Sequence, residues 1–370
     1  MARLVVLFSA DFLGGSELFN LEFLDAVRAW DGIEVHAVVP GDGPLNAALK
    51  PRVASVRTVA LPSALTTLSR FDARPGTRGA LTRVSHLRRY VGALRATVDR
   101  LGGAVCCFGF RSQLAYTLAG AALGRRTAWV VHEVVPETVY GRLWGLAATR
   151  PETVLTYSRA AAGQPLLRNA SVRVATVRFA LERFRAVPAP AAVRTVGMIG
   201  DLVELKNHLA FIDVVELLGG VQGVIVGRDL TRTLPATAPY VAEVRRRVAA
   251  SGGRVRLTEA APAEMPDRLA EIDVLLHLTS VPESFGRVAV EAMAAGRPVI
   301  AFDHGAVPEV VGEGGALVAP GDLTAVAAQI RELDLAAASV RARRAAERFE
   351  AGEQRDTLGD ELARFALGAA

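Results

Sequence analysis

Lysine is almost absent from this chain of 370 residues. Of the 43 basic residues, 41 are arginine, and the two lysines are Lys50 and Lys206. Cysteine is equally scarce, because the chain holds only the adjacent pair Cys106 and Cys107 inside an apolar stretch. We expect two reduced core thiols rather than a vicinal disulfide or a metal site, which is typical of a cytoplasmic protein. A lysine kept against such an arginine bias is a candidate functional residue.

Long apolar runs are also missing, although 51% of the residues are hydrophobic. The longest runs, such as Leu4–Phe8 and Ala128–Val131, have the length of a buried strand and fall far short of a membrane-spanning helix. The run after Arg3 is too brief for a signal peptide and fits a first strand. A chain of this length accommodates two domains of ordinary size.

Charge is divided unevenly along the chain. Residues 1–188 hold 24 basic against 13 acidic residues, whereas the remainder holds 19 against 25. The surplus suggests that the first half meets an anionic partner. Residues 78–98 form an amphipathic pattern with arginines opposite an apolar stripe, which is typical either of an ordinary domain helix with a solvated basic face or of peripheral contact with an anionic inner membrane face. The arginines are dispersed and accompany no nucleic-acid-binding motif, so a nucleic acid is not expected as a partner.

Strand-like runs alternate with helical patterns, which favours an α/β architecture with parallel sheets. A Pro- and Ala-rich linker at 187–191 separates two such series. We therefore predict a first Rossmann-like domain over 1–188, a second over 189–345, and a C-terminal helix over 346–370 that packs back on the first domain. The strands are predicted at Leu4–Phe8, Val35–Val39, Val105–Phe108, Ala128–Val131, Thr153–Thr156, Thr195–Ile199, Gly223–Val226, Val255–Leu257, Val274–Leu278 and Pro298–Phe302.

The segment from Pro282 to Ile300 is the most informative part of the sequence. Glu283 and Glu291 stand eight residues apart, and in a continuous helix they would share a face roughly 12 Å apart. Between them we expect a helix N-terminus whose free N–H groups favour a phosphate-like anion. Its opening residues are Ser284, Phe285 and Gly286. Two hydroxyl-binding carboxylates around an anion site suit a nucleotide sugar.

Three further places carry candidate residues. Gly14 and Gly15 follow the first strand and let a backbone approach a ligand, although a double glycine there is often only a turn. His132 directly follows a strand, at the sheet edge where α/β proteins bind ligands, although a satisfied buried histidine is the alternative. Of the other histidines, His277 looks buried within a strand and His304 lies in a loop.

Lys206 follows the first strand of the second series and the residues Gly200 and Asp201. A lysine entering a helix beyond a strand end can offer its charge to a diphosphate and offset the charge of a leaving group. An ordinary surface residue is the alternative.

Taken together, these motifs resemble the retaining glycosyltransferases of family 4, which have the GT-B fold. The resemblance runs nearly end to end, through the Gly14–Glu17 loop, His132, the Gly200–Asn207 loop, Val226–Gly227, the Pro282–Ile300 segment, Val307–Val311 and Ala319–Asp322. It implies two doubly wound Rossmann-like domains that face a central cleft. It also implies a nucleotide-sugar donor and a hydroxyl acceptor, and it implies neither a metal nor a cofactor. The basic surplus of the first domain permits an anionic acceptor.

The resemblance also assigns roles. Glu291 would hold the ribose hydroxyls, Glu283 the hydroxyls of the transferred sugar and Lys206 the diphosphate, while His132 would touch the sugar. Transfer would retain the anomeric configuration on one face of the sugar, with the leaving phosphate accepting the acceptor's proton. A non-catalytic nucleotide-sugar-binding subunit, an epimerase and a phosphorylase of the same fold are the alternatives.

Two departures from the family pattern stand out. Asp201 occupies a position where the family usually has arginine, and an acid beside a diphosphate should weaken binding unless another cation substitutes. We consider Arg228 and Arg287 as that cation. In addition, Val177–Ala180 replaces the usual Asn-Gly-Val-Asp ahead of the linker, in the region of the expected hinge.

Overall fold

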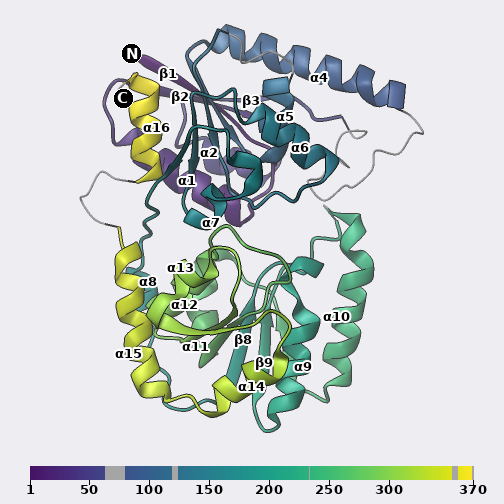
Figure 1. Cartoon of the computed structure of the whole chain (residues 1–370), viewed down its shortest axis with the longest axis vertical. Coiled ribbons are helices and arrows are strands. Elements are labelled where there is room, and N and C mark those ends of the chain that lie inside the picture. Colours follow the sequence, from purple (N-terminus) through teal and green to yellow (C-terminus); the bar gives the residue numbers. More distant parts are fainter. Residues whose placement is uncertain (63–79, 119–123, 233, 352–356, 369–370) are drawn as a thin grey trace. The chain divides into compact units, whose positions relative to one another are not determined.

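The computed structural model describes residues 1–62, 80–118, 124–232, 234–351 and 357–368 (Figure 1). The chain divides into two compact units. The first unit consists of Met1–Val177 and Glu353–Ala370, and the second unit of Arg178–Gly352. Each unit is built on one parallel sheet, so the predicted pair of Rossmann-like domains is confirmed as the fold class.

The first unit has a seven-stranded sheet of order β3-β2-β1-β4-β5-β6-β7. The strands are β1 (Ala2–Leu7), β2 (Ile33–Val39), β3 (Ser55–Thr58), β4 (Ala104–Phe108), β5 (Thr127–Val130), β6 (Thr153–Thr156) and β7 (Val172–Val174). Between them lie α1 (Gly15–Arg28), α2 (Pro44–Leu49), α4 (Ala80–Leu101), α5 (Phe110–Leu118), α6 (Val139–Ala147), α7 (Arg159–Ala162) and η1 (Pro165–Leu167). The central strands β4 and β5 are buried along their length, as expected for a parallel sheet covered on both faces. Both cysteines lie in β4, buried and unbridged, and burial raises the pKa of each thiol.

The predicted basic helix is α4, of which positions 78 and 79 fall outside the described residues. Its second half packs on the core through Leu94 and Val98. In its first half, two apolar residues of the predicted stripe, Val84 and Leu87, are exposed.

The C-terminal helix α16 (Leu358–Leu367) packs beside α1 and forms part of the first unit (Figure 1). Its residues Leu358 and Leu362 are fully buried. The approach to α1 is close, since a Cβ at Gly359 would lie 2.5 Å from the Ala26 Cβ. Asp360 accepts a hydrogen bond of 2.8 Å from the Trp30 indole, which fixes the position of α16 along α1.

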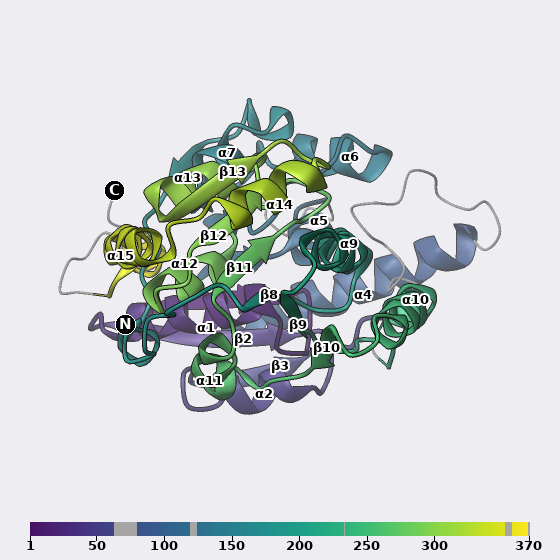
Figure 2. The ribbon, with the colours of Figure 1, turned by 90° about the horizontal axis from the view of Figure 1, so that it is seen from below.

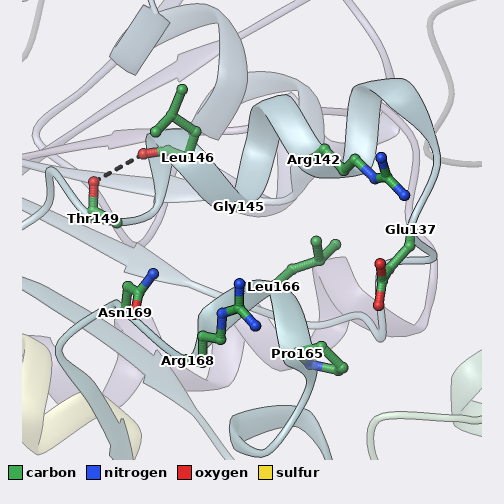
Figure 3. A pocket seen from close by; sticks show the side chains of 9 residues that line it. All are labelled: Glu137, Arg142, Gly145, Leu146, Thr149, Pro165, Leu166, Arg168 and Asn169. Carbon is green, nitrogen blue, oxygen red and sulfur yellow. Dashed lines mark hydrogen bonds between the residues drawn. The ribbon is translucent and has the colours of Figure 1, made fainter.

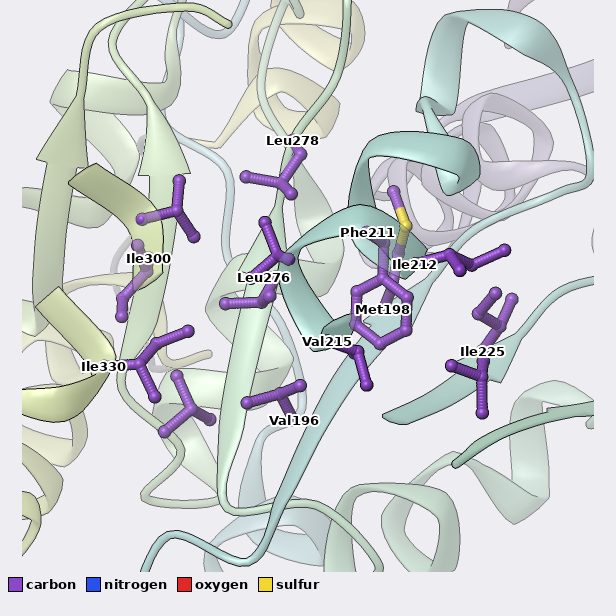
Figure 4. Close-up of a cluster of buried hydrophobic side chains, with 14 of the residues drawn as sticks. Val196, Met198, Phe211, Ile212, Val215, Ile225, Leu276, Leu278, Ile300 and Ile330 are labelled. Carbon is purple, nitrogen blue, oxygen red and sulfur yellow. The ribbon is translucent and has the colours of Figure 1, made fainter. Parts of the chain in front are cut away.

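The second unit has a six-stranded sheet of order β10-β9-β8-β11-β12-β13, a row that Figure 2 shows from below. The strands are β8 (Thr195–Ile199), β9 (Gln222–Val226), β10 (Val255–Thr258), β11 (Val274–His277), β12 (Val299–Phe302) and β13 (Gly315–Val318). The helices and 3₁₀ turns are α8 (Glu182–Arg185), η2 (Glu204–Lys206), α9 (His208–Leu218), η3 (Pro235–Thr237), α10 (Ala238–Ala250), η4 (Pro262–Glu264), α11 (Met265–Ala270), α12 (Arg287–Ala294), α13 (Val307–Val311), η5 (Gly312–Gly314), α14 (Leu323–Arg331), α15 (Leu335–Ala346) and η6 (Glu347–Phe349). Apolar side chains of β8, β11 and β12 meet those of α9 and α14 in the core drawn in Figure 4.

The Pro- and Ala-rich stretch at 187–191 lies inside the second unit, whereas the two units part after Val177. Arginines fasten this stretch: Arg343 donates to the Val187 carbonyl (2.6 Å), and Arg297 donates to the Pro188 carbonyl (2.6 Å). The composition of this stretch predicts a linker, because composition does not register these distant donors.

Candidate functional site

The loops that follow β8 and β11 form the candidate site of the second unit. These strands are neighbours at the point where the strand order reverses, and ligands of open α/β sheets bind beyond the carboxyl ends of strands at such a point. The two loops touch, because the Ser280 N–H donates to the Leu205 carbonyl over 2.9 Å.

Glu283 lies between Lys206 and His277. The Lys206 Nζ contacts Glu283 Oε1, and the His277 Nε2 lies 2.8 Å from Glu283 Oε2. Burial on its own raises the pKa of Glu283, but the combined attraction of Lys206 and His277 outweighs burial and holds that pKa well below its usual range. Glu283 is therefore ionised, so both of its oxygens accept hydrogen bonds and His277 Nε2 carries the donated proton.

The structure corrects the expected geometry of the two glutamates. Helix α12 begins at Arg287, with Gly286 as its N-cap at φ 91°, so Glu283 lies in the preceding loop and not on a continuous helix with Glu291. Neighbouring backbone fixes the loop, because the Ala306 N–H donates to the Glu283 carbonyl over 2.8 Å. A Cβ at Gly305 would lie 2.4 Å from that carbonyl oxygen, so this approach requires glycine.

The expected anion site at the start of α12 is only partly as predicted. Gly286 provides no side-chain cap, and a Cβ there would lie 3.3 Å from both Glu283 Oε2 and His277 Nε2. The Phe285 side chain is buried against Phe179 and Phe349, with ring centroids 5.9 Å and 5.5 Å away. Phe285 thus anchors the loop, and the backbone N–H groups at 284–286 stay the predicted ligands of an anion.

Glu291 is buried in α12 and pairs with Arg287, whose Nε donates to Glu291 Oε1 over 2.8 Å. The Arg287 guanidinium also lies over the Phe179 ring at 4.9 Å, in the segment that departs from the family pattern. Arg287, one of the two arginines considered as a substitute cation, is therefore already paired with Glu291.

The other arginine, Arg228, pairs with Asp201. Arg228 follows β9 and forms a two-pronged ion pair with Asp201, with Nε to Oδ1 at 2.8 Å and Nη2 to Oδ2 at 3.0 Å. The backbones are joined as well, since the Leu202 N–H donates to the Arg228 carbonyl over 2.9 Å and a Cβ at Gly227 would lie 2.5 Å from the Gly200 carbonyl oxygen. The negative charge at position 201 is thus neutralised from the adjacent loop.

The sequence predicts that Lys206 enters a helix directly, but the structure differs. It ends the 3₁₀ turn η2, and Asn207 follows in the left-handed conformation (φ 64°) before α9 begins. The Lys206 side chain passes over Gly200, whose Cβ would lie 3.2 Å from Lys206 Cδ. Buried His208 donates to the Gly200 carbonyl over 3.2 Å, and burial lowers the pKa of His208 to about 4, so the ring is neutral near pH 7.

In the first unit, Gly14 is the N-cap of α1. Buried Glu17 accepts hydrogen bonds from the Gly14 N–H (3.1 Å) and the Ser16 hydroxyl (3.0 Å), so Glu17 binds the start of the helix. Burial raises the pKa of Glu17 despite these bonds. Space differs at the two glycines: a Cβ at Gly14 would lie 2.7 Å from Glu17 Oε2, whereas nothing lies within 4 Å of one at Gly15.

His132 follows β5 and is buried among aromatic rings. It stacks parallel to Phe23, with centroids 6.3 Å apart, and its Nδ1 lies 3.0 Å from the Tyr157 hydroxyl. Burial lowers the pKa of His132 to about 3, so the ring is neutral. A neutral imidazole is suited to hydrogen bonding with an uncharged group such as a sugar hydroxyl.

Sequence reasoning missed His277 as part of the site. It was assigned to the strand interior, but it is the last residue of β11 and reaches Glu283 six positions later. Its place at a strand end was the available signal, as it was for His132. His304, in the loop after β12, lies 3.3 Å from the Thr279 hydroxyl and does not bond Glu283.

A hollow of about 390 Å³ lies elsewhere, in the first unit (Figure 3). It runs between α6 and the segment after α7, and its lining includes Glu137, Arg142, Leu146, Leu166, Arg168 and Asn169. None of the predicted site residues lines it. Across the described ranges, no group of three or more His, Cys, Asp or Glu side chains is placed to hold a metal ion, and no helix is long and apolar enough to cross a membrane.

Comparisons of sequence find similarity to a transferase family model, which lies within the second unit, and to two curated proteins. Residues 193–334 match the family model "Glycosyl transferases group 1". The chain is 30% identical over 209 residues to 2-deoxystreptamine glucosyltransferase of Streptomyces kanamyceticus, covering 51% of this chain and 52% of that protein. It is 48% identical over 62 residues to D-inositol 3-phosphate glycosyltransferase of Rhodococcus erythropolis, covering 15% and 14%. The matches therefore span about half or less of these relatives.

Comparisons of structure extend over the whole chain. HepE of Anabaena in complex with UDP-glucose superposes with a TM-score of 0.77 at 20% identity over 100% of both chains. Sucrose-phosphate synthase of Thermosynechococcus elongatus gives a TM-score of 0.70 at 18% identity, over 99% of this chain and 97% of that one. The chain has the GT-B fold of these structures, and its second unit carries the family match.

Proposed function

We propose that this protein transfers a sugar from a nucleotide-sugar donor to a hydroxyl acceptor with retention of the anomeric configuration. The observation that carries the proposal is the ionised Glu283, held between Lys206 and His277 beyond the carboxyl ends of β8 and β11. This cluster lies within the stretch that matches the glycosyltransferase family model. It offers carboxylate oxygens for sugar hydroxyls directly beside a cation for phosphate.

In this proposal the second unit binds the donor. The Lys206 ammonium binds the diphosphate. Glu283 binds the hydroxyls of the transferred sugar, and Glu291 binds the ribose hydroxyls. Backbone N–H groups of Ser284, Phe285 and Gly286 add to the phosphate site, as does Arg228. We propose further that His132 of the first unit contacts the sugar and that Gly14 and Gly15 contact donor phosphate or acceptor.

The proposed reaction occurs on one face of the sugar. The bond between the anomeric carbon and the phosphate oxygen breaks, and the acceptor oxygen bonds to that carbon. The acceptor's proton passes to the leaving phosphate oxygen, which releases a nucleoside diphosphate. The protein contributes orientation and charge stabilisation, chiefly from the Lys206 ammonium on the leaving diphosphate.

Donor and acceptor classes follow from the comparisons as proposals. UDP-glucose is the first donor to test, because HepE of similar fold was crystallised with it. A polyhydroxylated small molecule or glycan is the first acceptor class, because the matched Streptomyces protein is named a 2-deoxystreptamine glucosyltransferase. The basic surplus of residues 1–188 permits an anionic or lipid-linked acceptor, and the exposed half of α4 is the proposed peripheral membrane contact at the cytoplasmic face.

The test is a panel of UDP, GDP, ADP and TDP with their glucose derivatives. Thermal shift identifies the base, and release of nucleoside diphosphate, with water as a poor acceptor, measures turnover before the acceptor is known. Sugar release with a retained anomer supports the proposal. Isomerised donor indicates an epimerase, phosphate-dependent cleavage a phosphorylase, and binding without turnover a non-catalytic subunit.

A further inference from the structure

The two oxygens of the Glu283 carboxylate have different neighbours. Oε1 faces the Lys206 ammonium, which the proposed donor would engage through its diphosphate. Oε2 faces His277, over 2.8 Å. The exposed fractions of the side chains follow the same division, at 23% for Lys206, 14% for Glu283 and 4% for His277.

The two partners also differ in how firmly the fold holds them. His277 ends β11, which lies inside the sheet between β8 and β12, and it pairs in register with Ala301. Lys206 ends a three-residue 3₁₀ turn in a loop, and its flexible four-carbon stem carries the charge. A side chain from an interior strand is a fixed partner, whereas a lysine from a loop can exchange partners.

We propose that His277 is a positioning residue that holds Glu283 Oε2 throughout the catalytic cycle, while Oε1 exchanges the Lys206 ammonium for the hydroxyls of the donor sugar. This inference rests on the proposed function and adds His277, to which the proposed reaction gives no role. Donor phosphate withdraws Lys206 from Glu283, and the imidazole N–H then keeps the carboxylate from turning away. The sugar meets an oxygen that is already oriented.

The backbone supports the same arrangement. A side chain at Gly286 would crowd the contact, since its Cβ would lie 3.3 Å from both bonded atoms, and its φ of 91° disfavours residues other than glycine. The Ala306 N–H also holds the Glu283 main chain, because it donates to the Glu283 carbonyl. With its main chain fixed, Glu283 keeps rotation about its side-chain bonds as its main freedom, and His277 removes that freedom.

The test separates sugar binding from nucleotide binding. Calorimetry gives the dissociation constants of a nucleoside diphosphate and of the matching nucleotide sugar, for the pair that the wild type binds best, and their ratio isolates the sugar. His277→Leu removes the donor, and His277→Gln returns an N–H near the position of Nε2. His277→Asn keeps a polar amide but falls short of Glu283. Thr279→Val is the matched control, because it removes a buried hydroxyl at the same strand end that bonds His304 instead.

We expect His277→Leu and His277→Asn to reduce the sugar-dependent ratio about tenfold, with the affinity for the diphosphate alone changed less than about threefold. His277→Gln should recover most of the ratio, and Thr279→Val should preserve it. The Gln and Asn variants decide the question if the Leu variant does not fold. Ratios that are equal in the Gln and Asn variants would overturn the role of His277, whereas a wild type that binds no nucleotide sugar would overturn the proposed function itself.

Discussion

The ion pair between Asp201 and Arg228 makes the sharpest prediction, because the two side chains should matter little for folding and much for the donor. Their exposed fractions are 28% and 38%. Surface pairs of this kind contribute at most about 1 kcal/mol to stability. For a unit of this size, Arg228→Ala should therefore lower the melting temperature by less than about 4 °C.

Donor binding should respond far more strongly to the same change. A hydrogen bond between a guanidinium and a phosphate contributes about 1.5–3 kcal/mol. Its loss weakens nucleoside diphosphate binding on the order of ten- to a hundredfold. The free nucleoside lacks phosphate, so its affinity should change little, which calorimetry on the nucleoside and the diphosphate can measure side by side.

A second substitution tests the reasoning about charge. Arg228→Ala leaves the carboxylate of Asp201 uncompensated beside the diphosphate, so adding Asp201→Asn should recover part of the lost affinity. Such non-additivity is expected of residues in direct contact. The reasoning is refuted if Arg228→Ala binds the diphosphate as tightly as the wild type, or if the nucleoside loses affinity equally.

The remaining predictions concern the glutamate site, two buried histidines and the C-terminal helix. Glu283→Gln and Lys206→Ala should each lower donor turnover at least a hundredfold in the diphosphate-release assay, while far-UV circular dichroism stays unchanged. The pKa values of His132 and His208 fall from about 6.5 in the unfolded chain to about 3 and about 4 when folded, so the unfolded state binds more protons between these values. Stability should therefore fall as the pH drops below about 6.5, and His208→Gln should flatten this dependence in urea unfolding. Leu362→Ala, at a fully buried site on α16, should cost about 2–5 kcal/mol of the unfolding free energy of the first unit.

Each of these has a contrary result. A full-rate Glu283→Gln or Lys206→Ala variant would remove the assigned roles. An acid profile that His208→Gln leaves unaltered would assign the dependence to other groups. For the helix, Val340→Ala on an exposed face of α15 is the control, and a loss as large as that of Leu362→Ala would show that burial is not the cause.

All but one of the strands that sequence reasoning located lie inside their sheets, and the exception is the edge strand β10. β1, β4, β5, β8, β11 and β12 lie inside their sheets, and burial on both faces requires the continuous apolar runs that make them visible. The strands that it missed are β3, β7 and β13, each an edge strand of three or four residues with exposed positions. An edge strand pairs with a neighbour on one side only, and its exposed positions break the apolar run that would identify it as a strand.

The site was predictable to a similar depth. The places of Glu283 and Lys206 beyond strand ends could be predicted, because they follow from the alternation of strands and helices. Their partners could not. The ion pair of Asp201 with Arg228 joins two loops 27 positions apart, and the bond from His277 to Glu283 depends on a turn at Gly286 in the left-handed conformation. Side-chain pairing of this kind depends on loop geometry that no periodic pattern encodes.

The placement of α16 has a consequence for synthesis on the ribosome. The second unit is one continuous stretch, whereas the first unit needs residues on both sides of that stretch. At roughly 5–20 residues per second, about 175 residues of the second unit take roughly 9–35 s to emerge, and throughout that time α1 lacks the helix that covers it. The second unit can thus complete its core first, while the earlier-made first unit waits with an apolar face open to chaperones.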